Sequence, residues 1–190
     1  MKLLKLYIFF VLTLILLGCQ NAKIKNTSSE PSAPSGFNWY KSNQGIGSFL
    51  KPDGWYIKEE KNGNTNALFI SKEKIGTVGS FKTGLSVNQI NSWSSSQTTK
   101  PSNYAKSYAG KISTTGKILK KGTIKGNFSD MHVVRVIGNN KGVSTIVHHI
   151  VIGMDTKDQV YIISFESPEA SWEKEMKHGG PMLNYFILGN

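Results

Sequence analysis

Short apolar runs alternate with turn sequences over residues 115–165, and this pattern constrains the fold more than any other feature of the chain. Four segments rich in valine and isoleucine are predicted strands: residues 115–125, 131–138, 143–153 and 159–165. The last three are separated by two short polar segments, Asn139-Asn140-Lys141-Gly142 and residues 154–158. We therefore predict consecutive hairpins and an antiparallel sheet.

The chain from residue 37 onward shows the same alternation of short apolar runs with turn sequences. Its predicted strands are residues 37–40, 46–50, 55–58, 67–71 and 81–88. Pro52-Asp53-Gly54 and Asn62-Gly63-Asn64 are turn sequences, because proline fixes φ and glycine and asparagine tolerate positive φ. We expect residues 55–58 to pair back onto the strand that precedes Pro52.

Two segments carry helical patterns. Pro101 suits the first turn of a helix, and the apolar residues that follow share one helical face: Tyr104, Ala105, Tyr108, Ala109 and Ile112. A second helix is predicted to begin at Ser167-Pro168-Glu169, with the serine as its cap, and to end at Gly179-Gly180. Helices added to an antiparallel sheet indicate the α+β class.

An apolar stretch at the N-terminus ends at Cys19, the chain's single cysteine. Residues 6–17 follow a basic start and contain one polar residue, and they are too few to cross a bilayer as a helix. The sequence Leu16-Leu17-Gly18-Cys19 resembles the lipobox of bacterial lipoproteins, whose cysteine thiol carries a diacylglyceryl group. This resemblance implies a signal peptide at residues 1–18 and a membrane anchor on Cys19. The alternatives are an ordinary signal peptide and a buried N-terminal helix.

Residues 19–36 are polar and contain two prolines, so we predict a flexible tether there and a single domain at residues 37–190. With no second cysteine, that domain must be stabilised by its core and not by disulfides. Gln20 follows the cysteine where an aspartate would resemble an inner-membrane retention signal. In a two-membrane cell we therefore expect the outer membrane, with the domain facing the periplasm.

The positive charge is unevenly distributed. The formal net charge is +11, and it falls to +9 when residues 1–18 are removed. No acidic residue lies between Lys74 and Ser129, whereas nine lysines do: Lys74, Lys82, Lys100, Lys106, Lys111, Lys117, Lys120, Lys121 and Lys125. A basic face on an exported protein would attract lipid headgroups, an anionic polymer or an acidic envelope protein, whereas export argues against nucleic acid.

The densest part of this block is a candidate binding patch. It consists of four lysines: Lys117, Lys120, Lys121 and Lys125. The alternative is that these lysines line separate, solvated strand edges, where they discourage aggregation.

Three local sequences, taken together, resemble the PsbP-like superfamily. They are residues 49–55 (Phe-Leu-Lys-Pro-Asp-Gly-Trp), residues 83–87 (Thr-Gly-Leu-Ser-Val), and residues 161–168 followed by a helix that contains a tryptophan. The resemblance covers residues 37–190 and implies a central antiparallel sheet flanked by helices in an α/β/α sandwich. It also implies a non-enzymatic accessory or assembly role, since most members of the superfamily have one.

The residues themselves point to no catalytic, metal or cofactor site. His148 and His149 would face opposite sides of a strand and could not easily chelate one ion together, and no zinc-ligand spacing is present. No nucleophile elbow occurs, and the carboxylate pairs Glu59-Glu60 and Glu173/Glu175 are expected to be solvated. The sequence thus favours a non-catalytic binding lipoprotein, with an envelope hydrolase or ligand-processing enzyme, or a purely structural protein, as alternatives.

Overall fold

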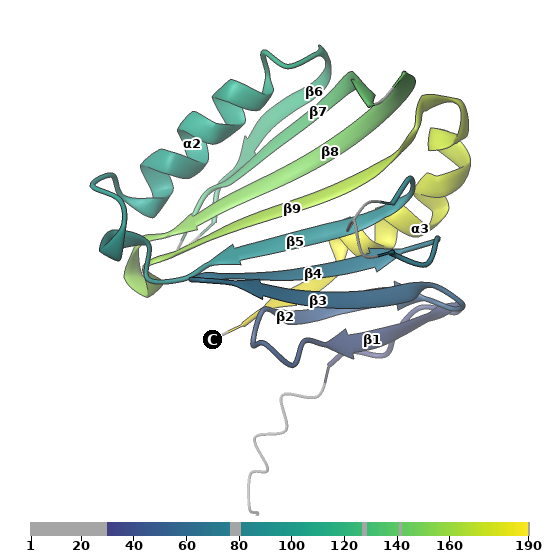
Figure 1. The fold of residues 1–190 in the computed structure, drawn as a ribbon, viewed down its shortest axis with the longest axis horizontal. Coiled ribbons are helices and arrows are strands. Elements are labelled where there is room, and N and C mark those ends of the chain that lie inside the picture. Colours follow the sequence, from purple (N-terminus) through teal and green to yellow (C-terminus); the bar gives the residue numbers. More distant parts are fainter. Residues whose placement is uncertain (1–29, 77–80, 127–128, 141, 190) are drawn as a thin grey trace, which may run out of the picture. The chain divides into compact units, whose positions relative to one another are not determined.

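The computed structural model describes residues 30–76, 81–126, 129–140 and 142–189. Its main element is a seven-stranded sheet with the order β3-β4-β5-β9-β8-β7-β6, in which all neighbours are antiparallel (Figure 1). The strands are β3 (Tyr56–Asn62), β4 (Thr65–Ser71), β5 (Gly84–Ile90), β6 (Lys117–Ile124), β7 (Met131–Asn140), β8 (Val143–Met154) and β9 (Gln159–Pro168). The hairpins predicted over residues 115–165 are therefore confirmed.

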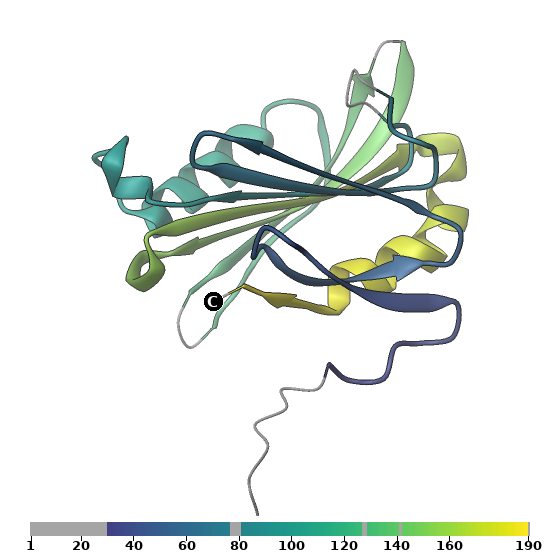
Figure 2. The same ribbon diagram turned by 60° about the horizontal axis from the view of Figure 1, so that its bottom comes forward.

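A smaller antiparallel sheet has the order β1-β2-β10, with strands β1 (Phe37–Lys41), β2 (Gly47–Pro52) and β10 (Phe186–Leu188). It lies on the same side of the large sheet as helix α3 (Trp172–Asn184), as Figure 2 shows. Helix α2 (Pro101–Ile112) packs on β7, β8 and β9 from the opposite side. An antiparallel sheet with a helix on each face confirms the predicted α+β class.

The large sheet separates two apolar cores. Alternate residues of a strand point to opposite faces, so Ile150 and Ile152 of β8 join one core whereas Val151 joins the other. The first core lies between the sheet, α3 and the small sheet, and its largest side chains include Phe49 and Phe165. The second core is smaller and consists of Ala105, Ala109, Ile112, Val134, Val136 and Val151. In α2, small alanines bring the helix close to the sheet.

The predicted pairing of residues 55–58 with the strand before Pro52 is wrong. β2 pairs with β1 on one edge and with β10 on the other, while β3 pairs with β4 in the large sheet. The chain therefore passes from one sheet to the other at Pro52-Asp53-Gly54. The Asn62-Gly63-Asn64 hairpin is confirmed, since Asn62 opposes Thr65 and Gly63 has φ of +56°.

Helix α3 differs from its prediction at both ends. A short 3₁₀ helix (Glu169–Ser171) comes first, and the Ser167 hydroxyl donates to the Pro168 carbonyl oxygen at 3.4 Å and caps no helix. Gly179-Gly180 does not end the helix, which continues to Asn184. Gly179 is buried against Phe165, and a Cβ there would lie 2.5 Å from Cε1 of that ring. The glycine thus allows the helix to contact β9 closely, and packing outweighs its low helix propensity.

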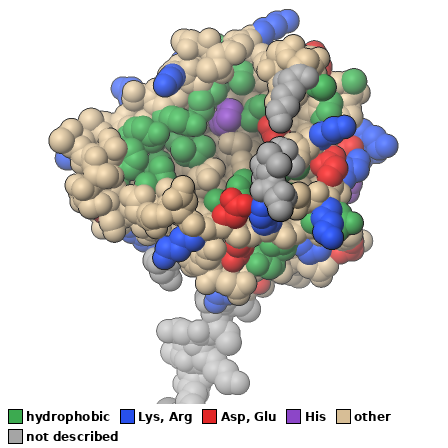
Figure 3. All heavy atoms as spheres, viewed as in Figure 1, with side chains coloured by type: hydrophobic (Ala, Val, Ile, Leu, Met, Phe, Trp, Pro, Cys, Tyr) green, Lys and Arg blue, Asp and Glu red, His purple; other side chains and the backbone are tan. Residues whose placement is uncertain are grey.

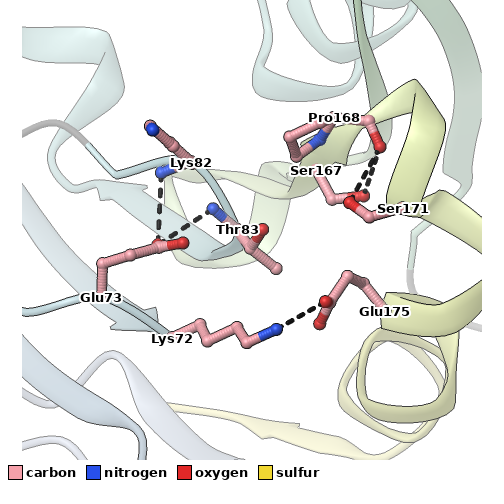
Figure 4. Close-up of polar contacts among 8 residues, drawn as sticks. All are labelled: Lys72, Glu73, Lys82, Thr83, Ser167, Pro168, Ser171 and Glu175. Atoms are coloured by element: carbon pink, nitrogen blue, oxygen red, sulfur yellow. Dashed lines mark hydrogen bonds and ion pairs between the residues drawn. The ribbon is translucent and has the colours of Figure 1, made fainter.

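A partly buried ion pair joins α3 to the end of β4 (Figure 4). Glu175 is 4% exposed, and its Oε1 accepts a hydrogen bond from Nζ of Lys72 at 2.6 Å. The expectation that the Glu173/Glu175 pair is solvated is therefore wrong for Glu175, because α3 turns that carboxylate toward the sheet. Beside it, the Glu73 carboxylate accepts bonds from the backbone N–H groups of Lys82 and Thr83.

The predicted signal peptide, Cys19 and residues 19–29 of the predicted tether lie outside the described residues. Within the part of the chain that the structure describes, neither helix is long and apolar enough to cross a bilayer.

The Gly179 contact predicts different effects for two neighbouring substitutions. Gly179→Ala forces a methyl group into Phe165 and should lower the free energy of unfolding by about 1–3 kcal/mol. Gly180→Ala meets no atom closer than Cε of Met176, at 3.9 Å, and should be neutral or raise it by up to about 1 kcal/mol. Urea denaturation of the two variants measures both values. Equal effects would contradict the proposed role of the Gly179–Phe165 contact.

Candidate functional site: a basic cleft between the large sheet and α3

A cleft of about 540 Å³ lies between the β6–β8 side of the large sheet and α3. Its volume falls within the range of small-molecule sites in proteins. The pairing register defines its sheet wall: Lys120 opposes Arg135, which in turn opposes His148, and all three line the cleft. The same register places Val133 beside Ile150 in the next row of this wall. One end of the cleft is therefore basic, and the wall beyond it is apolar.

Arg135 is held in place at the basic end. Its Nε donates a hydrogen bond to Nδ1 of His148 at 3.1 Å, and its guanidinium carbon lies 5.0 Å from the centre of the Trp172 ring. Burial lowers the pKa of the guanidinium, and the Glu173 carboxylate partly offsets this effect. Among the described residues, no carboxylate lies within ion-pair distance of Arg135 or Lys120. The cleft thus holds two cations without a paired acid.

His148 supports Arg135 and does not add a third charge. Burial, together with the charges of Arg135, Lys120 and His149, lowers the pKa of His148 to about 4. The ring is therefore neutral near pH 7, and because Nδ1 accepts the bond from Arg135, its proton resides on Nε2. His148 positions the guanidinium and leaves its terminal nitrogens available.

The remainder of the cleft is largely apolar. Val133 and Ile150 are only 6% and 7% exposed and form the floor, with Met131 and Ile124 beyond them. The opposite wall comes from α3 and β10, through Met176, Gly180, Leu183, Asn184 and Phe186. Asn184 is the polar side chain of this wall. A ligand that fits this cleft needs an anionic group at one end and apolar surface along the rest.

The structure separates the four lysines of the predicted patch. The register places Lys117 and Lys120 on the α3 side of β6 and Lys121 on the α2 side, and a bulge lies between Ile118 and Lys120. Lys121 lines a separate hollow of about 350 Å³ with Lys106 and His132. Lys125 follows the strand and pairs with Asp130 at 2.6 Å. Only Lys120 of the four lines the cleft, so these lysines do not form one face.

The sequence analysis missed Arg135, although the sequence contains a signal for it. Arg135 is the chain's only arginine, and it interrupts an apolar run that is otherwise buried. A lone cation in such a strand must either be paired or line a cavity.

The two adjacent histidines face opposite sides of β8, as predicted. His149 Nδ1 lies 2.8 Å from Oγ of Ser164 on the α2 side, and burial lowers its pKa to about 4. Figure 3 shows apolar side chains gathered on one face of the molecule, with a histidine at their edge. Within the described residues, no group of three His, Cys, Asp or Glu side chains could hold a metal ion.

The His149–Ser164 pair lacks the surroundings of a nucleophile. Ser164 lies in the middle of β9, where it pairs with Ser86 of β5 and with His149 of β8. The backbone N–H groups of both neighbouring strands are thus engaged in sheet ladders. A hydrolase needs free N–H groups aimed at a developing oxyanion, and this strand offers none.

Comparison with known proteins identifies no family model and no curated protein that matches the chain. Similar solved structures include a protein of Bacteroides thetaiotaomicron, at 11% identity over 82% of this chain and 49% of that chain, with a TM-score of 0.48. This chain therefore spans about half the length of that protein.

Two further structures are similar over most of their own length. The cyanobacterial PsbP of Synechocystis sp. PCC 6803 matches at 10% identity over 85% of this chain and 97% of that chain, with a TM-score of 0.49. The Ran-binding protein Mog1p of Saccharomyces cerevisiae matches at 11% identity over 80% and 95%, with a TM-score of 0.47. A PsbP protein is thus among the solved structures similar to this chain, and at these identities the likeness is one of fold alone.

The lowered histidine pKa values predict a pH dependence of stability. In the unfolded chain His148 and His149 have the ordinary pKa of 6.5, whereas in the folded chain it is about 4. Between these values the unfolded chain binds more protons, so the free energy of unfolding falls as the pH is lowered through this window, by up to about 3 kcal/mol per histidine.

Urea denaturation at about pH 7 and about pH 4.5 tests this expectation. The double variant His148→Gln/His149→Gln should lose most of the pH dependence, while the contribution of the carboxylates remains in both proteins. If the free energy of unfolding changes equally with pH in the variant and in the wild type, the prediction is contradicted.

Proposed function

We propose that this chain is a membrane-tethered, non-catalytic binding protein of the bacterial cell envelope, and that its cleft takes an anionic ligand. The observation that carries the proposal is the pair formed by Lys120 and Arg135, which oppose each other on neighbouring strands with no ion-paired acid among the described residues. Like charges at directly opposed positions destabilise a sheet. An anion between them would remove this repulsion.

The hydrogen bonds and ion pairs that the polar side chains form favour a binding role over the enzymatic alternative. His148 is engaged by Arg135, and His149 by Ser164 in a fully paired strand. The acid that faces the first core, Glu175, is paired with Lys72. These contacts hold side chains in place, and none of them presents an activated nucleophile or a general base to the cleft.

The location in the envelope is part of the same proposal. It rests on the resemblance of residues 16–19 to a lipobox and on Gln20, which together favour lipidation of Cys19 and the periplasmic face of the outer membrane. The polar residues of the tether would let the domain turn toward ligands near the membrane surface.

The anchor can be tested by membrane partitioning. Cys19→Ser removes the thiol that would carry the lipid, so the protein should leave the membrane fraction or accumulate as the unprocessed precursor. Gln20→Asp keeps the cysteine and serves as the control, which should remain membrane-attached and shift toward the inner membrane. Wild-type partitioning and processing of the Cys19→Ser protein would refute lipidation.

The cleft can be tested by cross-linking in intact cells. A photoreactive benzoylphenylalanine at Ile124, an exposed cleft residue, should form an adduct with the natural ligand. Lys120→Gln should lower the adduct yield by about fivefold, and less at high salt, because one solvent-exposed charge is lost. Lys117→Gln is the matched control, since Lys117 lies on the same strand and side but does not line the cleft. Equal yields from the two variants would count against a ligand held by Lys120.

A further inference from the structure

The geometry of the cleft points to a narrower ligand class, and this inference rests on the proposed function. We propose that the ligand is an amphiphile with a single acyl chain and an anionic headgroup. A fatty-acid carboxylate and a lysophospholipid phosphate share this chemistry. The headgroup binds between Lys120 and Arg135, and the chain lies along the apolar part of the cleft.

The basic end suits a carboxylate or a phosphate. The Nε of Arg135 is used by His148 and the guanidinium lies against the Trp172 ring, so its orientation is fixed. Its two terminal nitrogens remain to donate parallel hydrogen bonds to two oxygens of one headgroup. Lys120, across the strand pair, supplies a second charge on a flexible stem.

The apolar part suits an extended chain. From the row of Lys120 and Arg135, the sheet wall continues through Val133 to Met131, a distance of about 13 Å along the strand. Met176 and Leu183 of α3 line the opposite side. Gly180 leaves the space between the walls open, because the nearest atom to a Cβ built there is Cε of Met176, at 3.9 Å. Each methylene buried in such a cleft tightens binding by about three- to fourfold.

A thin chain fits this cleft better than an acidic protein segment does. The floor residues Val133 and Ile150 are nearly buried, so that a ligand must be narrow to reach them. A polypeptide would also bring backbone N–H and C=O groups that need partners, and beyond the basic end the wall offers little besides Asn184. An acyl chain has no such requirement.

Photolabelling of the full chain in nanodiscs of neutral phosphatidylcholine tests the inference. The probe is a long-chain fatty acid with a diazirine near the end of its chain. After irradiation, mass spectrometry should locate the label at the apolar end of the cleft, around Met131, Leu183 and Phe186. Unlabelled fatty acid should compete, whereas a fatty alcohol of equal length should need at least tenfold more. Lysophosphatidic acid as a second competitor distinguishes a phosphate from a carboxylate headgroup.

Two pairs of variants test the headgroup contact and the acyl-chain contact separately. Lys120→Gln should lower labelling by about fivefold and Lys117→Gln should leave it unchanged. Gly180→Leu places a side chain in the space for the acyl chain and should abolish labelling, whereas Gly180→Ala should retain most of it. Circular dichroism of each variant confirms folding before labelling is compared.

Labelling spread over the surface, or equal competition by the fatty alcohol, would overturn the inference. If the probe fails while the cross-link from Ile124 in cells forms with an acidic protein and depends on Lys120, the proposed function stands and the acyl ligand is wrong. If neither the fatty-acid labelling nor the cross-link from Ile124 depends on Lys120, both the inference and the proposed anionic-ligand function fail.

Discussion

The contact between Gly179 and Phe165 sets how closely α3 approaches the large sheet, and the space for the cleft depends on that approach. Because this position carries no side chain, the helix lies against β9, where Trp172 also packs on the Phe165 ring. β6 and β7 lie beyond the strand that α3 touches most closely, so space remains between them and the helix. The cleft is a consequence of a helix that packs closely on one side of a wide sheet.

The same packing explains how a cation is kept at the edge of an apolar core. Arg135 points to the side of the sheet that faces α3, and the Trp172 ring and His148 stabilise it there. Burial keeps His148 neutral, which lets its Nδ1 accept a hydrogen bond from the guanidinium. Two side chains that carry no charge at neutral pH, Trp172 and His148, thus hold the charged guanidinium of Arg135 in position.

Much of the fold was predictable because its rules are local. Turn sequences such as Asn62-Gly63-Asn64, the alternation along β8 and the proline at the start of α2 each act within a few residues, and all are confirmed. The predictions are wrong where a contact with a segment distant in the sequence determines the local structure. β10, more than 130 residues further along the chain, takes the edge of β2 that was assigned to residues 55–58, and Phe165 keeps α3 helical through Gly179-Gly180.

The same distinction between local and distant determinants applies to the candidate site. The sequence by itself determined an antiparallel α+β domain, a basic middle segment and the opposed faces of His148 and His149, because strand alternation and composition suffice for these. Only the tertiary structure decided that Lys120 opposes Arg135 in the cleft and that Lys117, Lys121 and Lys125 do not line it. The reason is strand register: a bulge at one position changes which lysines share a face, and no local pattern in the sequence reports it.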